Sequence, residues 1–397
     1  MADELITVDN ALAIAREVLG RAPLIDGHND LPWIIRIDRA ARGDVVAYDL
    51  TKVHERADTD IPRLREGMVG AQFWAAFQPT SAPYPGRTTL EQIDLILRIE
   101  EAHPDVFLPA RRAADYARAK AAGRIASFVA VEGGVGLENS LSPLRIWHAA
   151  GMRLMTLCHN ESLDWVDSAT DAPRNNGLNT FGRAVVGELN RLGVVIDLAH
   201  ASHDAMRRVL DVTEAPVALS HSNAYSLCDH PRNAPDDVLE RLKANGGLVM
   251  ATFVPGFVSQ PLRDWLRRSR DGSGKAPLVA DPKAQLAELE TRHGAAPKAS
   301  LEQVADHIVR LVETAGLDHV GVGSDYFGGA SPIGLEDVSR FPHLFAELVR
   351  RGFSERDLEK MSSKNMLRVL RRVEAVGASL RKTRAPALGR LEDYREA

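Results

Sequence analysis

The most regular feature of the chain is an alternation of short apolar runs with longer stretches of helical periodicity. The apolar runs are not interrupted by polar residues at every second position, which is typical of strands buried on both faces of a parallel sheet. We expect a strand at each of eight such runs: Leu24–Asp30, Val69–Phe77, Ile125–Val131, Leu154–Leu157, Val194–Leu198, Pro216–Leu219, Leu248–Phe253 and Val320–Val322.

Amphipathic patterns fill most of the intervals between these runs. Val185, Val186 and Leu189, for example, recur at the spacing of one helix face. Pro235 and Asp236 stand at the start of another pattern, as helix N-termini prefer. The helical patterns cover Asp9–Leu19, Ile93–Glu100, Leu144–Ala150, Thr180–Leu192, Asp236–Ala244, Leu301–Ala315 and Ser354–Val373.

Eight apolar strands separated by helices predict an α/β protein, and the number favours a closed (β/α)8 TIM barrel over an open sheet. An open doubly wound sheet is further disfavoured because the chain has neither a G-x-G-x-x-G motif nor a Walker loop. We expect one hydrolase domain over residues 1–397, with the barrel at about 22–375. Two intervals are too long for ordinary connections and are interpreted as insertions: 31–68, which is mostly polar and irregular, and 255–300.

Composition narrows the class of partner and the compartment. The formal net charge is −5 over 397 residues, which argues against nucleic acid or an anionic membrane as the main partner. Cys158 and Cys228, the two cysteines, cannot form a disulfide framework. The first residues do not resemble a signal peptide, and no apolar run is long enough to span a membrane. We therefore expect a cytoplasmic protein.

Residues of metal-ligating type lie at the ends of six predicted strands. The C-terminal ends of barrel strands form the active-site face, where a charged group is costly unless it is paired or metal-bound. Imidazole and carboxylate groups are ligands for zinc and similar divalent ions. The sequence therefore predicts a metal site made by His28, Asp30, Glu132, His159, His200, His221 and Asp325.

Each of these residues also has a structural interpretation. A histidine after a strand is often a turn residue, Glu132 could start a helix and Asp325 could cap one. Six such strand ends are difficult to attribute to independent accidents, and we favour the metal site. Seven further histidines are interpreted as surface or structural, with His203 supporting the site at most and His319 at the wrong end of its strand: His54, His103, His148, His203, His293, His319 and His343.

Several of these strand ends lie within longer motifs. They are His28-x-Asp30, Val131-Glu132-Gly133, Leu157-Cys158-His159-Asn160, Gly193 to His200, Ser220-His221-Ser222 and His230-Pro231-Arg232-Asn233. Together they closely resemble the membrane (renal) dipeptidase family of the amidohydrolase superfamily, from about residue 22 to residue 375. The resemblance implies an amidohydrolase-like barrel and a zinc-dependent dipeptidase.

Taken residue by residue, the resemblance implies a centre of two Zn²⁺ ions. His28 and Asp30 would hold one ion, His200 and His221 the other, and Glu132 would bridge both. The resemblance also gives a role to three further residues: His159 as a histidine that faces the substrate, Arg232 as the group that binds the substrate carboxylate, and Asp325 as the acid/base.

The resemblance also implies a homodimer and tolerance of a D-residue at the C-terminal position of the substrate. Mammalian relatives have a secretion signal and a lipid-anchor tail, and neither pattern is found in this sequence. We therefore expect no membrane anchor.

The residue types suggest a mechanism. Metals lower the pKa of a bound water to about 7, so a hydroxide that bridges the two metals would attack the peptide carbonyl. Asp325 would take the proton and return it to the leaving amine. The planar guanidinium of Arg232 suits a free C-terminal carboxylate one residue beyond the scissile bond, which would restrict the substrate to dipeptides.

Two other classes of function stay open. The same scaffold could hydrolyse N-acyl amino acids, lactones or β-lactams, or deaminate a substrate, because a barrel and its metals do not determine the substrate. A non-catalytic metal-dependent binding protein is disfavoured, since such a protein has no use for the full set of strand-end residues.

Overall fold

The computed structural model describes residues 7–55, 57–269 and 282–394. Within these ranges the strands form one parallel sheet in the order β2-β1-β9-β8-β7-β6-β5-β4-β3. Because β2 also pairs with β4, the sheet closes after eight strands and leaves β3 outside the ring. The strands are β1 (Leu24–Asn29), β2 (Val69–Phe77), β3 (Phe107–Pro109), β4 (Ile125–Glu132), β5 (Met152–Thr156), β6 (Val195–Asp197), β7 (Ala218–Leu219), β8 (Leu248–Ala251) and β9 (Val320–Val322).

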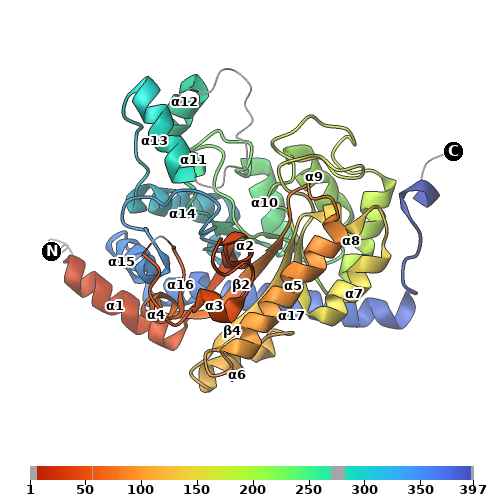
Figure 1. Cartoon of the computed structure of the whole chain (residues 1–397), viewed down its shortest axis with the longest axis horizontal. Helices are drawn as coiled ribbons and strands as arrows, with labels where there is room; N and C mark the ends of the chain where they lie inside the picture. The colour runs from red at the N-terminus through yellow and green to blue at the C-terminus, as the bar shows by residue number, and fades with distance from the viewer. Residues whose placement is uncertain (1–6, 56, 270–281, 395–397) are drawn as a thin grey trace.

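Helices surround the barrel, and the predicted (β/α)8 fold is confirmed (Figure 1). None of the helices in the described ranges is both long enough and apolar enough to cross a membrane. Their bounds are α1 (Val8–Arg21), α2 (Leu31–Ile37), α3 (Val45–Tyr48), α4 (Ile61–Glu66), α5 (Pro85–Ala102), α6 (Ala114–Ala121), α7 (Ser142–Ala150), α8 (Thr180–Leu192), α9 (His203–Val212), α10 (Asp236–Asn245), α11 (Pro255–Val258), α12 (Gln260–Ser269), α13 (Pro282–His293), α14 (Leu301–Ala315), α15 (Phe341–Arg350), α16 (Glu355–Glu359) and α17 (Asn365–Thr383).

Strand β3 was not predicted from the sequence. It pairs with the first residues of β4, where Ala126 has Ala71 of β2 on one side and Leu108 of β3 on the other. From Val129 onward, β5 takes the place of β3 beside β4. Three residues are too few to produce a periodic pattern, so only the pairing reveals this strand.

The interval 31–68, which we expected to be mostly polar and irregular, contains three short helices that the sequence did not predict. The side chain of Asp44 accepts the backbone N–H groups of Val46 and Ala47 at the start of α3. Asp60 does the same for Arg63 at the start of α4. Helices this short depend on their caps more than on apolar periodicity, and the periodicity therefore missed them.

The second insertion contains helices α11, α12 and α13, which project from one side of the barrel (Figure 1). Residues 270–281 of this interval lie outside the described residues. The helix predicted over Ser354–Val373 is also more complex than expected. It consists of α16, a π-helical turn over Lys360–Lys364, and α17, which continues to Thr383.

The two ends of the barrel differ. The amide of Asn365 in α17 donates to the carbonyl of Val320 at the start of β9, at 2.9 Å. Arg368 donates to the carbonyl of Gly247 just before β8, at 3.2 Å. Helix α17 therefore crosses the N-terminal ends of these strands, and the C-terminal ends are left for the connecting loops and the residues that they carry.

Candidate metal centre

The residues predicted from strand ends come together at the C-terminal face of the barrel. His28 lies in β1 and Asp30 follows directly after it, while Glu132 is the last residue of β4. The other four follow β5, β6, β7 and β9 by two or three residues: His159, His200, His221 and Asp325. Because parallel strands end at one rim, residues almost 300 positions apart in the chain meet there.

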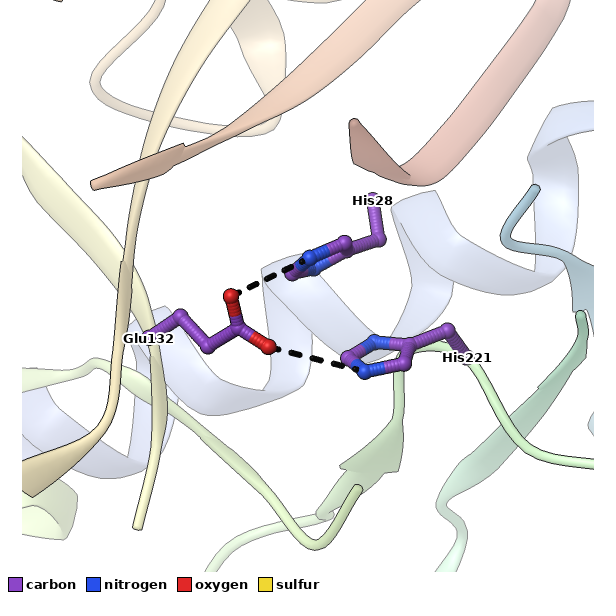
Figure 2. Close-up of side chains that lie close together, drawn as sticks. All are labelled: His28, Glu132 and His221. Carbon is purple, nitrogen blue, oxygen red and sulfur yellow. Dashed lines mark ion pairs between the residues drawn. The ribbon is translucent and has the colours of Figure 1, made fainter. Parts of the chain in front are cut away.

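Glu132 lies at the middle of this group. Its Oε2 is 3.4 Å from Nε2 of His28, and its Oε1 is 3.7 Å from Nε2 of His221 (Figure 2). The same Oε1 is 3.1 Å from Nε2 of His200. The two carboxylate oxygens therefore face different histidines, one on the β1 side and two on the side of β6 and β7.

Two further carboxylates surround His28. Oδ2 of Asp30 is 3.6 Å and Oδ1 of Asp325 is 3.9 Å from the His28 Nε2 atom. Asp325 has a φ angle of +61°, and His200 has one of +67°. Residues other than glycine seldom adopt this left-handed conformation, and the surrounding structure must hold them there.

His159 lies beside Glu132 and His200. Its ring centroid is 4.3 Å from that of His200 and 4.7 Å from that of Phe77, the last residue of β2. The carbonyl oxygen of His159 accepts a hydrogen bond from the Ser168 hydroxyl at 2.6 Å. The imidazole is thus packed between an aromatic ring and a second imidazole.

These residues form three overlapping sets in which the possible ligand atoms lie within 4.8 Å of one another. The described part of the chain has no such set outside this centre. The sets are His28, Glu132 and His221; Glu132, His159 and His200; and His28, Asp30 and Asp325.

The unpaired atoms in this group fit a metal cation. Nε2 of His28, Nε2 of His221, Nδ1 of His200 and Oδ1 of Asp30 are buried and have no hydrogen-bond partner. A buried polar atom without a partner costs free energy, and a divalent cation would satisfy several of these lone pairs at once. Neutral imidazole nitrogens and carboxylate oxygens are the donors that such a cation needs.

Protonation differs between the two sides of the group. Burial lowers the pKa of His28, but the nearby carboxylates of Glu132 and Asp30 outweigh this effect and raise its pKa well above the ordinary value. Burial, together with nearby positive groups, lowers the pKa values of His200 and His221 well below that value. The first imidazole therefore favours its charged form and the other two their neutral form.

Burial and neighbouring charges also shift the pKa values of Asp325, Glu132 and His159. Burial, with the negative charges of Asp30 and Glu132, raises the pKa of Asp325 to about 8. Burial also raises the pKa of Glu132. Burial, with the positive charge of Arg232, lowers the pKa of His159 to about 3.

Arg232, on the loop after β7, is 1% exposed. Its Nη2 donates to the carbonyl of His221 at 3.4 Å, while Nε and Nη1 have no hydrogen-bond partner. The guanidinium carbon lies 5.3 Å from the ring centroid of Phe257. Burial lowers the pKa of Arg232, although Asp325 and Glu132 oppose this shift. The structure thus presents a buried guanidinium with unused donors beside the metal centre.

Comparison with known proteins now identifies the group to which this centre belongs. A sequence model of the membrane dipeptidase family, peptidase family M19, matches residues 12–384. The chain belongs to this family. Dipeptidase ataJ from Aspergillus terreus is 37% identical over an alignment of 402 residues that covers 92% of this chain and 88% of the relative.

Solved structures of dipeptidases share the fold. The probable dipeptidase PvdM from Pseudomonas aeruginosa is 25% identical, with a TM-score of 0.79 over 93% of this chain and 99% of that one. Dipeptidase AC, a metallopeptidase of family M19, is 25% identical, with a TM-score of 0.72 over 89% of this chain and 98% of that one.

These comparisons confirm the predicted membrane dipeptidase family, the barrel and the enzyme class. The family consists of metallo-dipeptidases, which are hydrolases that act on peptide bonds. The structure supplies a cluster suited to the metal. The roles given to the individual residues stay predictions.

Two buried carboxylates were given no role from the sequence. Asp26 in β1 and Asp197 in β6 are both 0% exposed. Their signal was present in the sequence, because each interrupts an apolar run, between Ile25 and Gly27 and between Ile196 and Leu198. A carboxylate inside a buried strand needs hydrogen-bond partners. The partners of Asp26 and Asp197 include the residues that directly precede His200, His221 and Asp325.

Proposed function

We propose that the protein is a zinc-dependent dipeptidase which hydrolyses dipeptides with a free C-terminal carboxylate, L-Xaa-D-Xaa among them. The observation that carries the proposal is the orientation of Glu132, whose two oxygens face His28 on one side and His200 and His221 on the other. A carboxylate with one oxygen on each side is arranged to bridge two cations.

The ligands divide accordingly. His28 and Asp30 would hold one Zn²⁺, His200 and His221 the other, and Glu132 both. Zinc is supported by the donor set, since mixed imidazole and carboxylate ligands are usual for zinc in hydrolases. When bound, the metals would supply a water of lowered pKa and polarise the scissile carbonyl.

The side chains around the ligands would handle the proton and the oxyanion. The Asp325 carboxylate would take the proton from the attacking water and deliver it to the leaving nitrogen. Its place beside His28, with Oδ1 3.9 Å from Nε2, supports this role. His159, on the other side of Glu132, would face the substrate and donate a hydrogen bond to the developing oxyanion.

Arg232 would bind the substrate carboxylate. Its Nε and Nη1 atoms are buried without partners, and a carboxylate that accepts from both would form a bidentate, charge-assisted pair. Because Arg232 donates to the carbonyl of His221, a carboxylate bound there would lie beside the metal centre, which supports dipeptides over longer peptides.

Metal analysis combined with a substrate panel tests the proposal. We expect two zinc ions per chain, and hydrolysis of L-Xaa-L-Xaa and L-Xaa-D-Xaa dipeptides that is lost on chelation and restored by zinc. C-terminally amidated dipeptides should be poor substrates. Turnover of N-acyl amino acids, lactones or β-lactams without turnover of any dipeptide would replace the proposal by another amidohydrolase activity.

The homodimer and the cytoplasmic location predicted from the sequence belong to the same proposal. Sedimentation of the purified protein tests the dimer, which should be observed with and without zinc. Cell fractionation with antibody detection tests the location, and recovery of the protein with membranes would contradict it.

A further inference from the structure

Two buried carboxylates in the barrel strands contact residues next to the metal centre but are not among its possible ligands. Asp197 ends β6 and Asp26 lies in β1, and neither is a member of the three possible ligand sets. Each instead accepts hydrogen bonds from residues that directly precede the proposed ligands and the proposed acid/base. The two sets of contacts do not overlap, and each serves a different side of the centre.

Asp197 holds the residues before His200 and His221. Its Oδ1 accepts the backbone N–H groups of Ala199 at 3.0 Å and Ser220 at 2.8 Å. Its Oδ2 accepts the hydroxyls of Thr156 and Ser220, both at 2.6 Å. One carboxylate therefore connects the loop after β6 with the loop after β7.

Ser220 extends this connection to the imidazole of His221, since its Oγ lies 2.7 Å from Nδ1. The hydroxyl hydrogen of Ser220 is donated to Asp197, so Oγ must act as acceptor toward His221, and the ring carries its proton on Nδ1. The lone pair of the ring is then on Nε2, the atom that faces Glu132. Such a second partner sets the tautomer of a metal-binding histidine.

Asp26 makes the corresponding contacts with Ser324, the residue before Asp325. Its Oδ1 accepts the backbone N–H of Ser324 and its Oδ2 accepts the Ser324 hydroxyl, both at 2.7 Å. Gln72 of β2 donates to the same Oδ2 at 3.0 Å. Asp325 has a left-handed backbone conformation, which costs free energy unless the surrounding structure holds it. The two hydrogen bonds from Ser324 to Asp26 fix the backbone directly before Asp325.

We infer that Asp197 and Asp26 are separate positioning residues: Asp197 orients His200 and His221 for metal binding, and Asp26 orients Asp325 for proton transfer. The inference rests on the proposed function for the roles of His200, His221 and Asp325. It assigns different losses to the two carboxylates, whereas a general contribution to folding would produce the same loss for both.

The first experiment measures zinc affinity by competition with a chromophoric chelator in Asp197→Asn and Ser220→Ala. Both oxygens of Asp197 accept hydrogen bonds. In Asp197→Asn the NH2 group takes the place of one of them, in either orientation of the amide, and cannot accept. Ser220→Ala removes the hydroxyl that contacts His221 Nδ1 and donates to Asp197, but it keeps the backbone hydrogen bond from residue 220 to Asp197. It is the milder variant should Asp197→Asn fail to fold. We expect the zinc ion assigned to His200 and His221 to be bound about 10- to 100-fold less tightly in both variants.

The second experiment measures kcat, KM and zinc content in Asp26→Asn and Ser324→Ala. We expect kcat to fall about 10- to 100-fold, since a displaced general acid/base loses part of its contribution. KM should stay within about twofold of the wild type, and both zinc ions should be retained. Ser324→Ala keeps the fold contacts of Asp26 with Gln72 and is the variant to rely on if Asp26→Asn is unstable.

Asp115→Asn is the matched control for both experiments. Asp115 is 3% exposed and accepts the backbone N–H groups of Arg111 at 2.9 Å and Arg112 at 3.1 Å. It lies on α6, which carries none of the site residues (Figure 1). This variant should lose thermal stability without a change in zinc affinity or in the ratio of kcat to KM.

The outcomes separate this inference from the proposed function. If the wild type binds two zinc ions and hydrolyses dipeptides but Ser220→Ala keeps its zinc affinity, the role of Asp197 is overturned. If Ser324→Ala loses zinc or changes KM as much as kcat, the role of Asp26 is overturned. A wild type without zinc or dipeptide turnover overturns the proposed function, and with it the roles on which the inference rests.

Discussion

The two sides of the metal centre contain the same kind of residue in opposite electrostatic states. His28, on the β1 side, has a pKa well above the ordinary value, while those of His200 and His221, after β6 and β7, are well below it. All three imidazoles are buried, so burial alone would lower all three pKa values. The difference is in the neighbouring charges, because the carboxylates of Glu132 and Asp30 lie beside His28, while Arg232 and the neighbouring imidazoles further lower the pKa values of His200 and His221.

This comparison shows that the two proposed metal positions are prepared differently. On the side of His200 and His221 the nitrogens are already neutral and can bind a cation without losing a proton. On the side of His28 and Asp325 a cation must displace protons, because both groups hold them near neutral pH. Four experiments follow from the comparison, and the first removes the group that joins the two sides.

Glu132→Gln should have the largest effect. Glutamine keeps the shape of the side chain but replaces one oxygen by an NH2 group, which cannot bind a cation. We expect loss of at least one metal per chain and a fall in kcat/KM of about 10⁴-fold or more, since a metal stabilises the transition state by several kcal/mol. Metal content after dialysis and the rate on a dipeptide are measured together. Retention of both metals and of activity would refute the bridging role.

Asp325→Asn separates chemistry from metal binding on the β1 side. We expect the rate to fall by about 10²- to 10⁴-fold, the usual contribution of a general acid/base, with the metal content near normal. Asp30→Asn is the matched variant, because its carboxylate also lies beside His28 but is a proposed ligand, and it should lose metal. If Asp325→Asn loses metal to the same extent, Asp325 is a ligand and not the acid/base.

Arg232→Ala should raise KM for dipeptides with a free carboxylate by about 10- to 100-fold, the value of a hydrogen bond to a charged group. Amidated dipeptides, which lack the carboxylate, should be affected far less. Arg207→Ala, on the part-exposed surface of α9, is the control and should change neither. An equal loss for both substrates would show that the positive charge of Arg232 acts on the metal centre instead.

The pH dependence of metal binding should show the smallest effect. The pKa of Asp325 is raised to about 8 and that of His28 is raised well above its ordinary value. Both groups hold protons at pH 6 that a metal must displace, so the affinity should rise between pH 6 and pH 8, by up to about tenfold per unit for each proton. Calorimetry in buffers of different ionisation enthalpy counts the protons released. A pH-independent affinity would contradict the predicted protonation of this side.

The raised pKa of Asp325 also determines how the stability of the metal-free protein changes with pH. Asp325 has a folded pKa near 8, above that of the unfolded chain, so the folded state binds the extra proton between about pH 4 and pH 8. Its contribution to stability is present at low pH and is lost as the pH rises through 8. Zinc should therefore raise the melting temperature more at pH 8 than at pH 6.

Much of the site could be predicted because its residues lie at or just after the ends of the apolar runs that form the barrel strands. An apolar run followed by His221 or Asp325 indicates the C-terminal end of a barrel strand, and such ends share one rim. The strand β3 and the short helices of 31–68 could not be predicted in this way. Three residues of strand and helices of four to seven residues carry too little periodicity.

The sequence by itself determined the order of the eight barrel strands, the donor type at six strand ends and the membership of the dipeptidase family, because apolar periodicity and motif spacing are local properties of the chain. Only the tertiary structure decided which oxygen of Glu132 faces which histidine, which imidazoles hold a proton, and that Asp26 and Asp197 lie beneath Asp325 and His221. These properties depend on distances between groups that are far apart in the chain, and a pKa or a tautomer is set by such neighbours and not by the residue that carries it.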